Sequence, residues 1–284
     1  MLTVLESIKL STEYLQKKGI ESPRTNAELL LSKILKCKRL DLYLAFERPL
    51  TEEETNQYRQ FIKRRGRFEP LQYIVGTVEF YGIEFLVNPS VLIPRPETEI
   101  LVETILEEAD KSNNLKILDI GCGSGNISIS LAKNLPNSEV VSIDCSDDAL
   151  KVAQQNAEFN GVGSQIKFLK NDITVDSEFK YDKFDIVVSN PPYIAKEEFN
   201  LLKPELQNYE PKIALTDGSD GFSFYKIISS KAKNFLSSKG KLYFEVGQGQ
   251  AETVKNIMKK ELYSNINFKK DYLNIDRVVK GEML

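Results

Sequence analysis

The sequence predicts an α/β protein whose mostly parallel sheet is covered by helices and preceded by a small all-α domain. Three observations support this class. From residue 116 onward, short apolar runs alternate with stretches of helical periodicity, as in chains that alternate strands and helices. The first seventy or so residues read as short helices. Between these regions, TVEFYGIEFLVN has the alternation of a β-hairpin around Tyr81-Gly82.

The helical patterns near the amino terminus have recognisable start signals. Thr51 followed by Glu54 is a capping box for TEEETNQYRQFIKRR, and Thr25 is the expected cap of TNAELLLSKILK. We therefore expect three parts along the chain: a helical domain over residues 1–74, a β-hairpin linker over residues 75–90 and an α/β domain over residues 91–284.

Apolar runs mark the expected strands of the α/β domain. They are residues 116–120, 139–143, 166–169, 184–189, 241–246, 266–272 and 277–281. Helical patterns separate most of these runs, which implies a parallel sheet with helices on both faces. In such sheets ligands bind at the carboxyl ends of the strands, near the point where the strand order reverses. Functional residues are therefore expected in the loops that follow these runs.

Composition excludes several kinds of protein and site. The chain is 41% apolar and 28% charged, and no apolar run approaches the ~18 residues of a membrane span. There is no histidine, and the three cysteines form no Cys-x-x-Cys pair. A structural zinc site and a histidine-activated nucleophile are thereby excluded, and we expect no metal. The amino terminus lacks the pattern of a signal peptide, which predicts a cytoplasmic location.

The charge distribution argues against nucleic acid as the main partner. The net charge of −3 is divided as +2 over residues 1–90 and −5 over residues 91–284. A dedicated duplex-binding protein usually has a clear basic excess. KRRGR, residues 63–67, is the one dense basic cluster, and a solvated helix end explains it.

A glycine-rich loop follows the first expected strand. The segment DIGCGSGN, residues 119–126, opens a helix and has glycines at positions 121, 123 and 125. Glycine permits positive φ angles and lets the backbone approach a ligand closely. A dinucleotide fingerprint would place the third glycine at position 126, which is Asn126. The spacing therefore disfavours a nicotinamide oxidoreductase.

Acidic residues at the ends of the next two strands strengthen the prediction of a cofactor site. Asp144 ends the second strand, where a carboxylate can accept hydrogen bonds from both hydroxyls of a ribose. Asp172 follows the third strand, where a contact to the edge of an adenine is expected, with Ile173 as an apolar wall. Helix capping is the alternative role of a strand-end aspartate, but three such features in register favour a nucleoside-containing cofactor.

The fourth strand ends in VVSNPPYI, residues 187–194. The prolines lack backbone N–H groups and hold the preceding residues extended, so this corner is rigid. The Asn190 side-chain oxygen and the Pro191 carbonyl oxygen can each accept one N–H of a planar amine and stabilise the charge that develops as its nitrogen is methylated. Tyr193 would supply a flat face against the planar group.

These motifs together resemble a known family. DIGCGSG with Asp144 and NPPY resembles class I S-adenosylmethionine-dependent methyltransferases that act on planar amino groups. More narrowly, AELLL, RRGRFEPLQYIVGTVEFYG, LIPRPETE, EPKIALTDGSDGFSFYKII and FEVGQGQ resemble the protein-(glutamine-N5) methyltransferases of the HemK/PrmC type. The resemblance implies a seven-stranded Rossmann-like domain, S-adenosyl-L-methionine as cofactor, and the glutamine of the Gly-Gly-Gln motif of peptide chain release factors as substrate. It also implies that the helical domain helps to hold the release factor.

The resemblance also implies roles for individual residues. The cofactor set is Asp119, Gly121, Cys122, Gly123, Ser124, Gly125, Asp144, Asp172, Ile173 and Asn190. The substrate set is Asn190, Pro191, Pro192 and Tyr193, of which Asn190, Pro191 and Tyr193 are the catalytic candidates. Ile173 departs from the family pattern, in which an aromatic residue is frequent, so stacking on adenine from that side is not expected. The long connection over residues 194–216 is expected to be a substrate-facing flap.

The residues alone leave three alternative functions open. Asn-Pro-Pro-Tyr suits any planar amine, so a nucleic-acid methyltransferase acting on adenine or guanine amino groups is one alternative. A methyltransferase for a ribosomal-protein glutamine is a second. A non-catalytic binding protein that retains the fold is a third, and the intact glycine loop, Asp144 and Asn190 argue against it.

Overall fold

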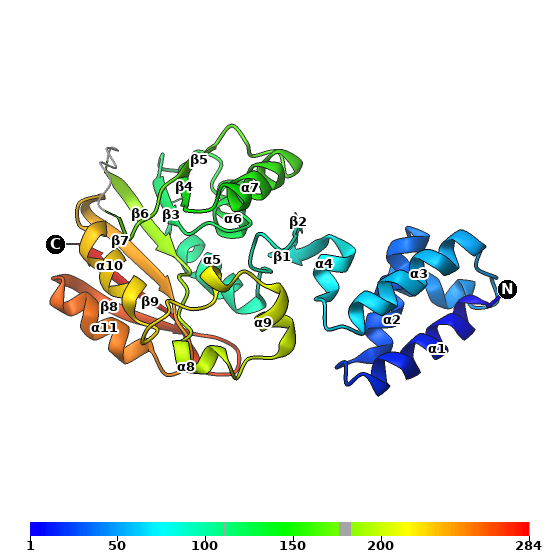
Figure 1. Ribbon diagram of the computed structural model, residues 1–284. Helices are drawn as coiled ribbons and strands as arrows, with labels where there is room; N and C mark the ends of the chain where they lie inside the picture. Colours follow the sequence, from blue (N-terminus) through cyan, green and yellow to red (C-terminus); the bar gives the residue numbers. More distant parts are fainter. Residues whose placement is uncertain (111, 176–182, 284) are drawn as a thin grey trace. The chain divides into compact units, whose positions relative to one another are not determined.

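The computed structural model describes residues 1–110, 112–175 and 183–283 (Figure 1). The described residues divide into two compact units. One contains Met1–Thr77 and Lys203–Tyr209, and the other contains Val78–Leu202 and Glu210–Leu284. No pattern in the sequence had indicated that residues 203–209 belong with the amino-terminal helices. The boundaries expected at residues 74 and 90 stay predictions.

Helices pack around an apolar core in the first unit, which we call the helical unit. Its elements are α1 (Val4–Lys17), α2 (Pro23–Leu35), η1 (Arg39–Ala45), α3 (Glu52–Arg65), α4 (Leu71–Val75) and α9 (Pro204–Tyr209). Leu30, Leu31 and Leu42 are fully buried in this core. Because each helix is short, its stability comes mainly from burying an apolar face against its neighbours.

The start of α3 was predicted correctly, whereas the start of α2 was not. Thr51 Oγ1 accepts from the Glu54 amide at 3.2 Å and Glu54 Oε2 accepts from the Thr51 amide at 2.8 Å, which is the predicted capping box. The prediction that Thr25 caps α2 is wrong, because the helix already begins at Pro23. Proline suits the first helical position, where its fixed φ is preorganised and its missing N–H would be unpaired anyway.

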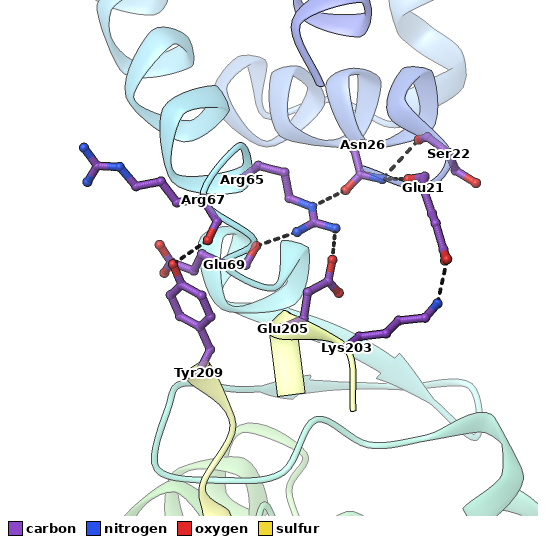
Figure 2. Close-up of polar contacts among 9 residues, drawn as sticks. All are labelled: Glu21, Ser22, Asn26, Arg65, Arg67, Glu69, Lys203, Glu205 and Tyr209. Atoms are coloured by element: carbon purple, nitrogen blue, oxygen red, sulfur yellow. Dashed lines mark hydrogen bonds and ion pairs between the residues drawn. The ribbon is translucent and has the colours of Figure 1, made fainter. Parts of the chain in front are cut away.

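A buried arginine joins α9 to the other helices of the helical unit (Figure 2). The Arg65 side chain is 5% exposed and its guanidinium forms an ion pair with Glu205. Arg65 Nε donates to Asn26 Oδ1 at 2.6 Å and Nη1 donates to the Glu69 carbonyl at 2.9 Å. Nearby, Tyr209 Oη donates to the Arg67 carbonyl at 2.8 Å. Residues 203–209 are therefore held by specific polar contacts.

A predicted hairpin follows the amino-terminal helices in the sequence. Strands β1 (Thr77–Phe80) and β2 (Ile83–Leu86) pair with one another. The turn residues Tyr81 and Gly82 both have positive φ, at 50° and 69°. Positive φ at both central residues is what a tight two-residue hairpin turn requires.

In the described part of the second unit, which we call the α/β unit, seven strands form one sheet in the order β5-β4-β3-β6-β7-β9-β8. The strands are β3 (Lys116–Ile120), β4 (Glu139–Asp144), β5 (Ile166–Lys170), β6 (Phe184–Ser189), β7 (Leu236–Glu245), β8 (Tyr263–Lys270) and β9 (Asp276–Met283). Neighbouring strands from β5 to β7 are parallel, and β9 is antiparallel to both of its neighbours. This arrangement confirms the predicted mostly parallel sheet.

Helices cover both faces of this sheet (Figure 1). The helices packed on it are α5 (Pro96–Glu108), α6 (Asn126–Asn134), α7 (Asp147–Phe159), α10 (Ser223–Ala232) and α11 (Ala251–Lys260). Two short helices of this unit, α8 (Lys196–Phe199) and η2 (Lys212–Ala214), have no buried residues. Ile117 packs in the core shared with α5, α6 and α7, whereas its neighbour Leu118 packs in the core shared with α10 and α11. The alternation follows from the two-residue period of a strand, and burial on both faces explains the nearly continuous apolar runs.

The strand order brings the two predicted functional loops together. From β3 the chain builds outward through β4 to β5, and it then returns to place β6 on the other side of β3. Ile120 at the end of β3 is paired with Ser189 at the end of β6. The reversal of strand order therefore lies between β3 and β6, where ligands bind in sheets of this kind.

We expect the Arg65–Glu205 pair to stabilise the helical unit. Glu205→Gln keeps the side-chain shape but removes the charge that balances a buried guanidinium, a loss of ~1–3 kcal/mol. Amides of α2 and α3 should then exchange with deuterium about tenfold faster or more, as measured by mass spectrometry. Lys203→Gln is the control, because the Lys203–Glu21 pair has side chains 63% and 78% exposed and should contribute little. Unchanged protection in Glu205→Gln would contradict the expectation.

Candidate functional site

The glycine loop has the backbone geometry that its sequence predicted. Gly121, Gly123 and Gly125 have φ angles of +77°, +54° and +79°. A Cβ at Gly125 would lie 3.0 Å from Ile129 and 3.2 Å from Ala153, so this glycine lets α6 pack closely on α7. A Cβ at Gly121 or Gly123 would meet no described atom within 4 Å. The space above these two glycines is therefore open to a ligand.

A cavity of about 280 Å³ lies along the carboxyl ends of β3, β4, β5 and β6. From the predicted set it is lined by Gly121, Cys122, Gly123, Ser124, Asp144, Asp172, Ile173, Asn190, Pro191 and Pro192. Three other members of that set, Asp119, Gly125 and Tyr193, lie outside the lining. Leu92, Pro94 and Arg95 line the cavity from the segment that leads into α5, and Thr98 lines it from the first turn of that helix. The cavity thus brings together the cofactor and substrate candidates.

Asp144 braces the glycine loop as well as lining the cavity. Its Oδ2 accepts from the Gly123 amide and its Oδ1 accepts from the Ser146 amide, both at 2.9 Å. Each carboxylate oxygen can accept a further hydrogen bond. The alternative role, helix capping, does not apply to Asp144, because the N-cap residues of α6 and α7 are Gly125 and Ser146. The carboxylate keeps acceptor capacity for ribose hydroxyls.

Asp172 and Ile173 lie at the end of β5. Asp172 is exposed, and its Oδ1 accepts from both the amide and the hydroxyl of Thr174, at 2.9 and 2.7 Å. Ile173 is buried against the core that also contains Ile228 of α10. Both residues line the cavity, and among the described residues no hydrogen bond to the second oxygen of Asp172 is found, which leaves it for a ligand.

Asp119 is a fully buried carboxyl next to the loop. Neither of its oxygens has a hydrogen-bond partner among the described residues. Burial raises the pKa of Asp119 to about 7, and the neighbouring Ser128 only partly opposes this shift. Cys122 is also fully buried, and burial raises the pKa of its thiol well above the usual value. This thiol is therefore protonated near neutral pH.

The Asn-Pro-Pro-Tyr corner is held from behind by the FEVGQGQ segment. Gln250 Nε2 donates to the Tyr193 carbonyl at 2.9 Å, and Gln250 Oε1 accepts from the Gly247 amide at 3.0 Å. A Cβ at Gly221 would lie 2.5 Å from the Tyr193 carbonyl oxygen. The backbone at Tyr193 is thus fixed on two sides, which sequence reasoning missed because it used these segments only as family motifs.

The predicted flap is a closed loop with further helices in it. The Ile194 amide donates to the Leu215 carbonyl at 3.0 Å, so the two ends of residues 194–216 meet. Glu210 is buried, accepts from the Ile93 amide at 3.2 Å and forms an ion pair with Arg95. Arg95 lines the cavity, so this segment also positions a cationic side chain there.

Neither a metal group nor a membrane span is found in the described residues. Within residues 1–110, 112–175 and 183–283, no three His, Cys, Asp or Glu side chains are grouped so that they could hold a metal ion. Over the same residues, every helix is too short or too polar to cross a bilayer.

The raised pKa of Asp119 has a measurable consequence for stability. A carboxyl that keeps its proton up to pH ~7 when folded, against ~3.8 when unfolded, lowers stability increasingly as the pH rises between these values. Asp119→Asn removes this dependence. We expect its free energy of unfolding, relative to the unsubstituted chain, to be ~2 kcal/mol higher at pH 8 than at pH 5 in urea denaturation.

The control for this measurement is Asp148→Asn. The Asp148 side chain is 68% exposed and its pKa is lowered by a hydrogen bond from Lys151, so it is ionised at both pH values. Its effect on stability should be the same at pH 5 and pH 8. The same result for Asp119→Asn would show that Asp119 is not protonated in the folded chain at pH 5.

Solved structures with similar folds include the following two. A methyltransferase from Pyrococcus furiosus aligns with a TM-score of 0.52 over 72% of this chain and 90% of its own, at 18% identity. The catalytic domain of hMettl16, solved in complex with MAT2A 3′UTR hairpin 6, aligns with a TM-score of 0.56 over 82% of this chain and 83% of its own, at 17% identity. These similarities confirm the predicted Rossmann-like methyltransferase fold.

Comparison of sequences identifies the family more narrowly than comparison of folds does. Residues 6–76 match the family described as PrmC N-terminal domain, and residues 111–280 match the family described as Methyltransferase domain. The release factor glutamine methyltransferase of Geobacter sulfurreducens is 41% identical over 99% of this chain and 97% of its own length. Proteins of the same name from Chlorobaculum tepidum and Bacillus cereus are 39% and 35% identical, over 97% and 99% of this chain and 95% and 100% of their own lengths. The chain is therefore a methyltransferase and belongs to the release factor glutamine methyltransferase family.

Proposed function

We propose that this enzyme transfers a methyl group from S-adenosyl-L-methionine to the side-chain amide nitrogen of the glutamine in the Gly-Gly-Gln motif of peptide chain release factors. The observation that carries the proposal is one cavity in which an open glycine loop and the Asn-Pro-Pro corner meet. Similarity over almost the whole chain to enzymes named for release factor glutamine supports this substrate.

The residues at the strand ends fit the proposed cofactor. The open backbone at Gly121 and Gly123 accommodates a close ligand, and Asp144 keeps acceptor capacity for ribose hydroxyls. Asp172 and Ile173 offer a polar and an apolar contact for the adenine. When bound, the cofactor supplies an electrophilic methyl carbon attached to a sulfonium sulfur. The chain itself supplies binding, orientation and exclusion of water.

The chemical difficulty lies in the substrate. The nitrogen of a planar amide is a poor nucleophile, because its lone pair is delocalised into the carbonyl group. Acceptors that take its two N–H groups favour the geometry in which the lone pair is localised, and they stabilise the positive charge that develops. The Asn190 side-chain oxygen and the Pro191 carbonyl oxygen are these acceptors in our proposal. Neighbouring prolines and the Gln250 contact to Tyr193 keep the corner rigid.

The proposed protein partner and its binding involve both ends of the chain. The release factor is the protein partner, residues 1–74 help to hold it, residues 75–90 form the linker, and residues 91–284 carry the catalytic site. Tyr193 lies outside the cavity lining, so its place beside the substrate amide is part of the proposal that depends on the bound complex. A release factor substrate is consistent with action in the cytoplasm.

A substrate panel tests this function. The purified chain is incubated with labelled S-adenosyl-L-methionine and with release factors, ribosomal proteins or nucleic acids. We expect label on the release factor alone, and a mass increase of one methylene group on the peptide that contains the Gly-Gly-Gln glutamine. A release factor with that glutamine replaced by alanine is the matched control and should remain unlabelled. Label on nucleic acid or ribosomal protein instead would overturn the proposed substrate.

Two substitutions separate chemistry from cofactor binding. Asn190→Ala removes a preorganised acceptor and should lower kcat by about 10²–10³ while the affinity for S-adenosyl-L-methionine changes less. Asp144→Ala should weaken that affinity by about a hundredfold or more, because two charge-assisted hydrogen bonds are lost. Calorimetry measures the affinity, and the exposed Asp148→Ala is the control for both. Near-normal turnover of Asn190→Ala would refute the role of this side chain.

A further inference from the structure

A row of buried polar groups lies beside Asn190. Thr98 in the first turn of α5 and Glu245 at the end of β7 are each 2% exposed. Ser189 pairs with Phe244, so Asn190 and Glu245 are the next residues along two neighbouring parallel strands. Asn190 Nδ2 donates to Thr98 Oγ1 at 3.2 Å. Three elements far apart in the sequence thus place a carboxamide, a hydroxyl and a carboxyl together.

The Glu245 carboxyl is the charged member of this row. Burial raises its pKa to about 7, and hydrogen bonding with Thr98 and Asn190 and the charge of Arg277 oppose that shift. Its Oε2 is buried without a hydrogen-bond partner among the described residues. Burying the Glu245 carboxyl costs free energy, and the group is incompletely paired, so it does not stabilise the fold.

The direction of the hydrogen bonds follows from what each group can do. An ionised carboxylate only accepts, whereas a hydroxyl both donates and accepts. If Thr98 donates its proton to the neighbouring Glu245 carboxylate, its Oγ1 is left as an acceptor, and the group that it meets at 3.2 Å is Asn190 Nδ2. An acceptor at Thr98 selects the amide nitrogen for this side of the Asn190 carboxamide.

This selection matters because the two ends of a carboxamide have nearly the same shape. With Nδ2 held by Thr98, the atom of Asn190 left for the cavity is the carbonyl oxygen Oδ1. The opposite orientation would present N–H groups toward the N–H groups of a substrate amide, which repel one another. Shape alone does not distinguish these orientations, and the hydrogen-bond partners do.

We propose that Thr98 and Glu245 are positioning residues that orient the Asn190 carboxamide with its Oδ1 toward the amide nitrogen of the substrate. The inference rests on the proposed function for the identity of that substrate. The orientation itself is a property of the free chain. Neither residue transfers a proton or contacts the reacting atoms in this proposal.

Two isosteric substitutions and one conservative one test the proposal. Thr98→Val removes the hydroxyl, Glu245→Gln replaces the acceptor with a group that can also donate, and Thr98→Ser retains the hydroxyl. We expect kcat to fall by roughly tenfold to a hundredfold in Thr98→Val and Glu245→Gln. The affinity for S-adenosyl-L-methionine should change little, and Thr98→Ser should restore most of the turnover. Equal turnover in Thr98→Val and Thr98→Ser would overturn the inference.

A double-mutant cycle distinguishes an effect of Thr98 through Asn190 from a general structural effect of the substitution. If Thr98 acts through Asn190, then Thr98→Val should lower kcat much less when Asn190 is already alanine. A loss of the same factor in both backgrounds would show that Thr98 acts by another route and would contradict the proposal.

A spectroscopic measurement keeps the inference separate from the proposed function. In ¹⁵N-asparagine-labelled protein without ligand, the Asn190 side-chain NH₂ signals are identified by their loss in Asn190→Ala. We expect these signals to shift in Thr98→Val and Glu245→Gln but to stay near their original positions in Thr98→Ser. Unshifted signals would refute the orientation even if release factor is methylated. Shifted signals with no methylation of release factor would count against the proposed function alone.

Discussion

The pairing of β3 with β6 is the constraint on which the site depends. Glycine loop and Asn-Pro-Pro corner are separated by more than sixty residues, yet both leave the sheet at the paired ends Ile120 and Ser189. Ser189 Oγ also donates to the Ile120 carbonyl at 2.7 Å in the buried interior. Because parallel strands with buried faces tolerate no change of register, the two loops are placed relative to one another by the core.

Buried carboxyls distinguish this edge of the sheet from the core beneath it. Asp119 and Glu245 lie at the carboxyl ends of β3 and β7, and burial raises the pKa of each to about 7. Apolar residues of similar volume would make the fold more stable. Retaining buried carboxyls at the edge of the sheet that carries the cavity is the kind of local violation expected where a chain gives up stability for binding and orientation.

The segment after the Asn-Pro-Pro-Tyr corner contributes to both units. Its ends, at Ile194 and Leu215, meet beside the corner, and Glu210 binds Arg95 of the cavity. Its middle part, residues 203–209, belongs to the helical unit, where Arg65 pairs with Glu205 (Figure 2). One stretch of chain therefore links the helices to the residues that follow the proposed substrate site.

Local signals in the sequence determined the strands, the Tyr81-Gly82 turn and the α3 capping box. They also determined the positions of the glycine loop, Asp144 and Asn190. Each of these features depends on neighbouring residues or on strand periodicity. Tertiary structure alone decided the contacts of Arg65 with Glu205 and of Asn190 with Thr98, whose partners are 140 and 92 residues apart. Burial, which sets the pKa of Asp119, and the partners that orient a carboxamide arise only when distant segments pack together, so no local pattern encodes them.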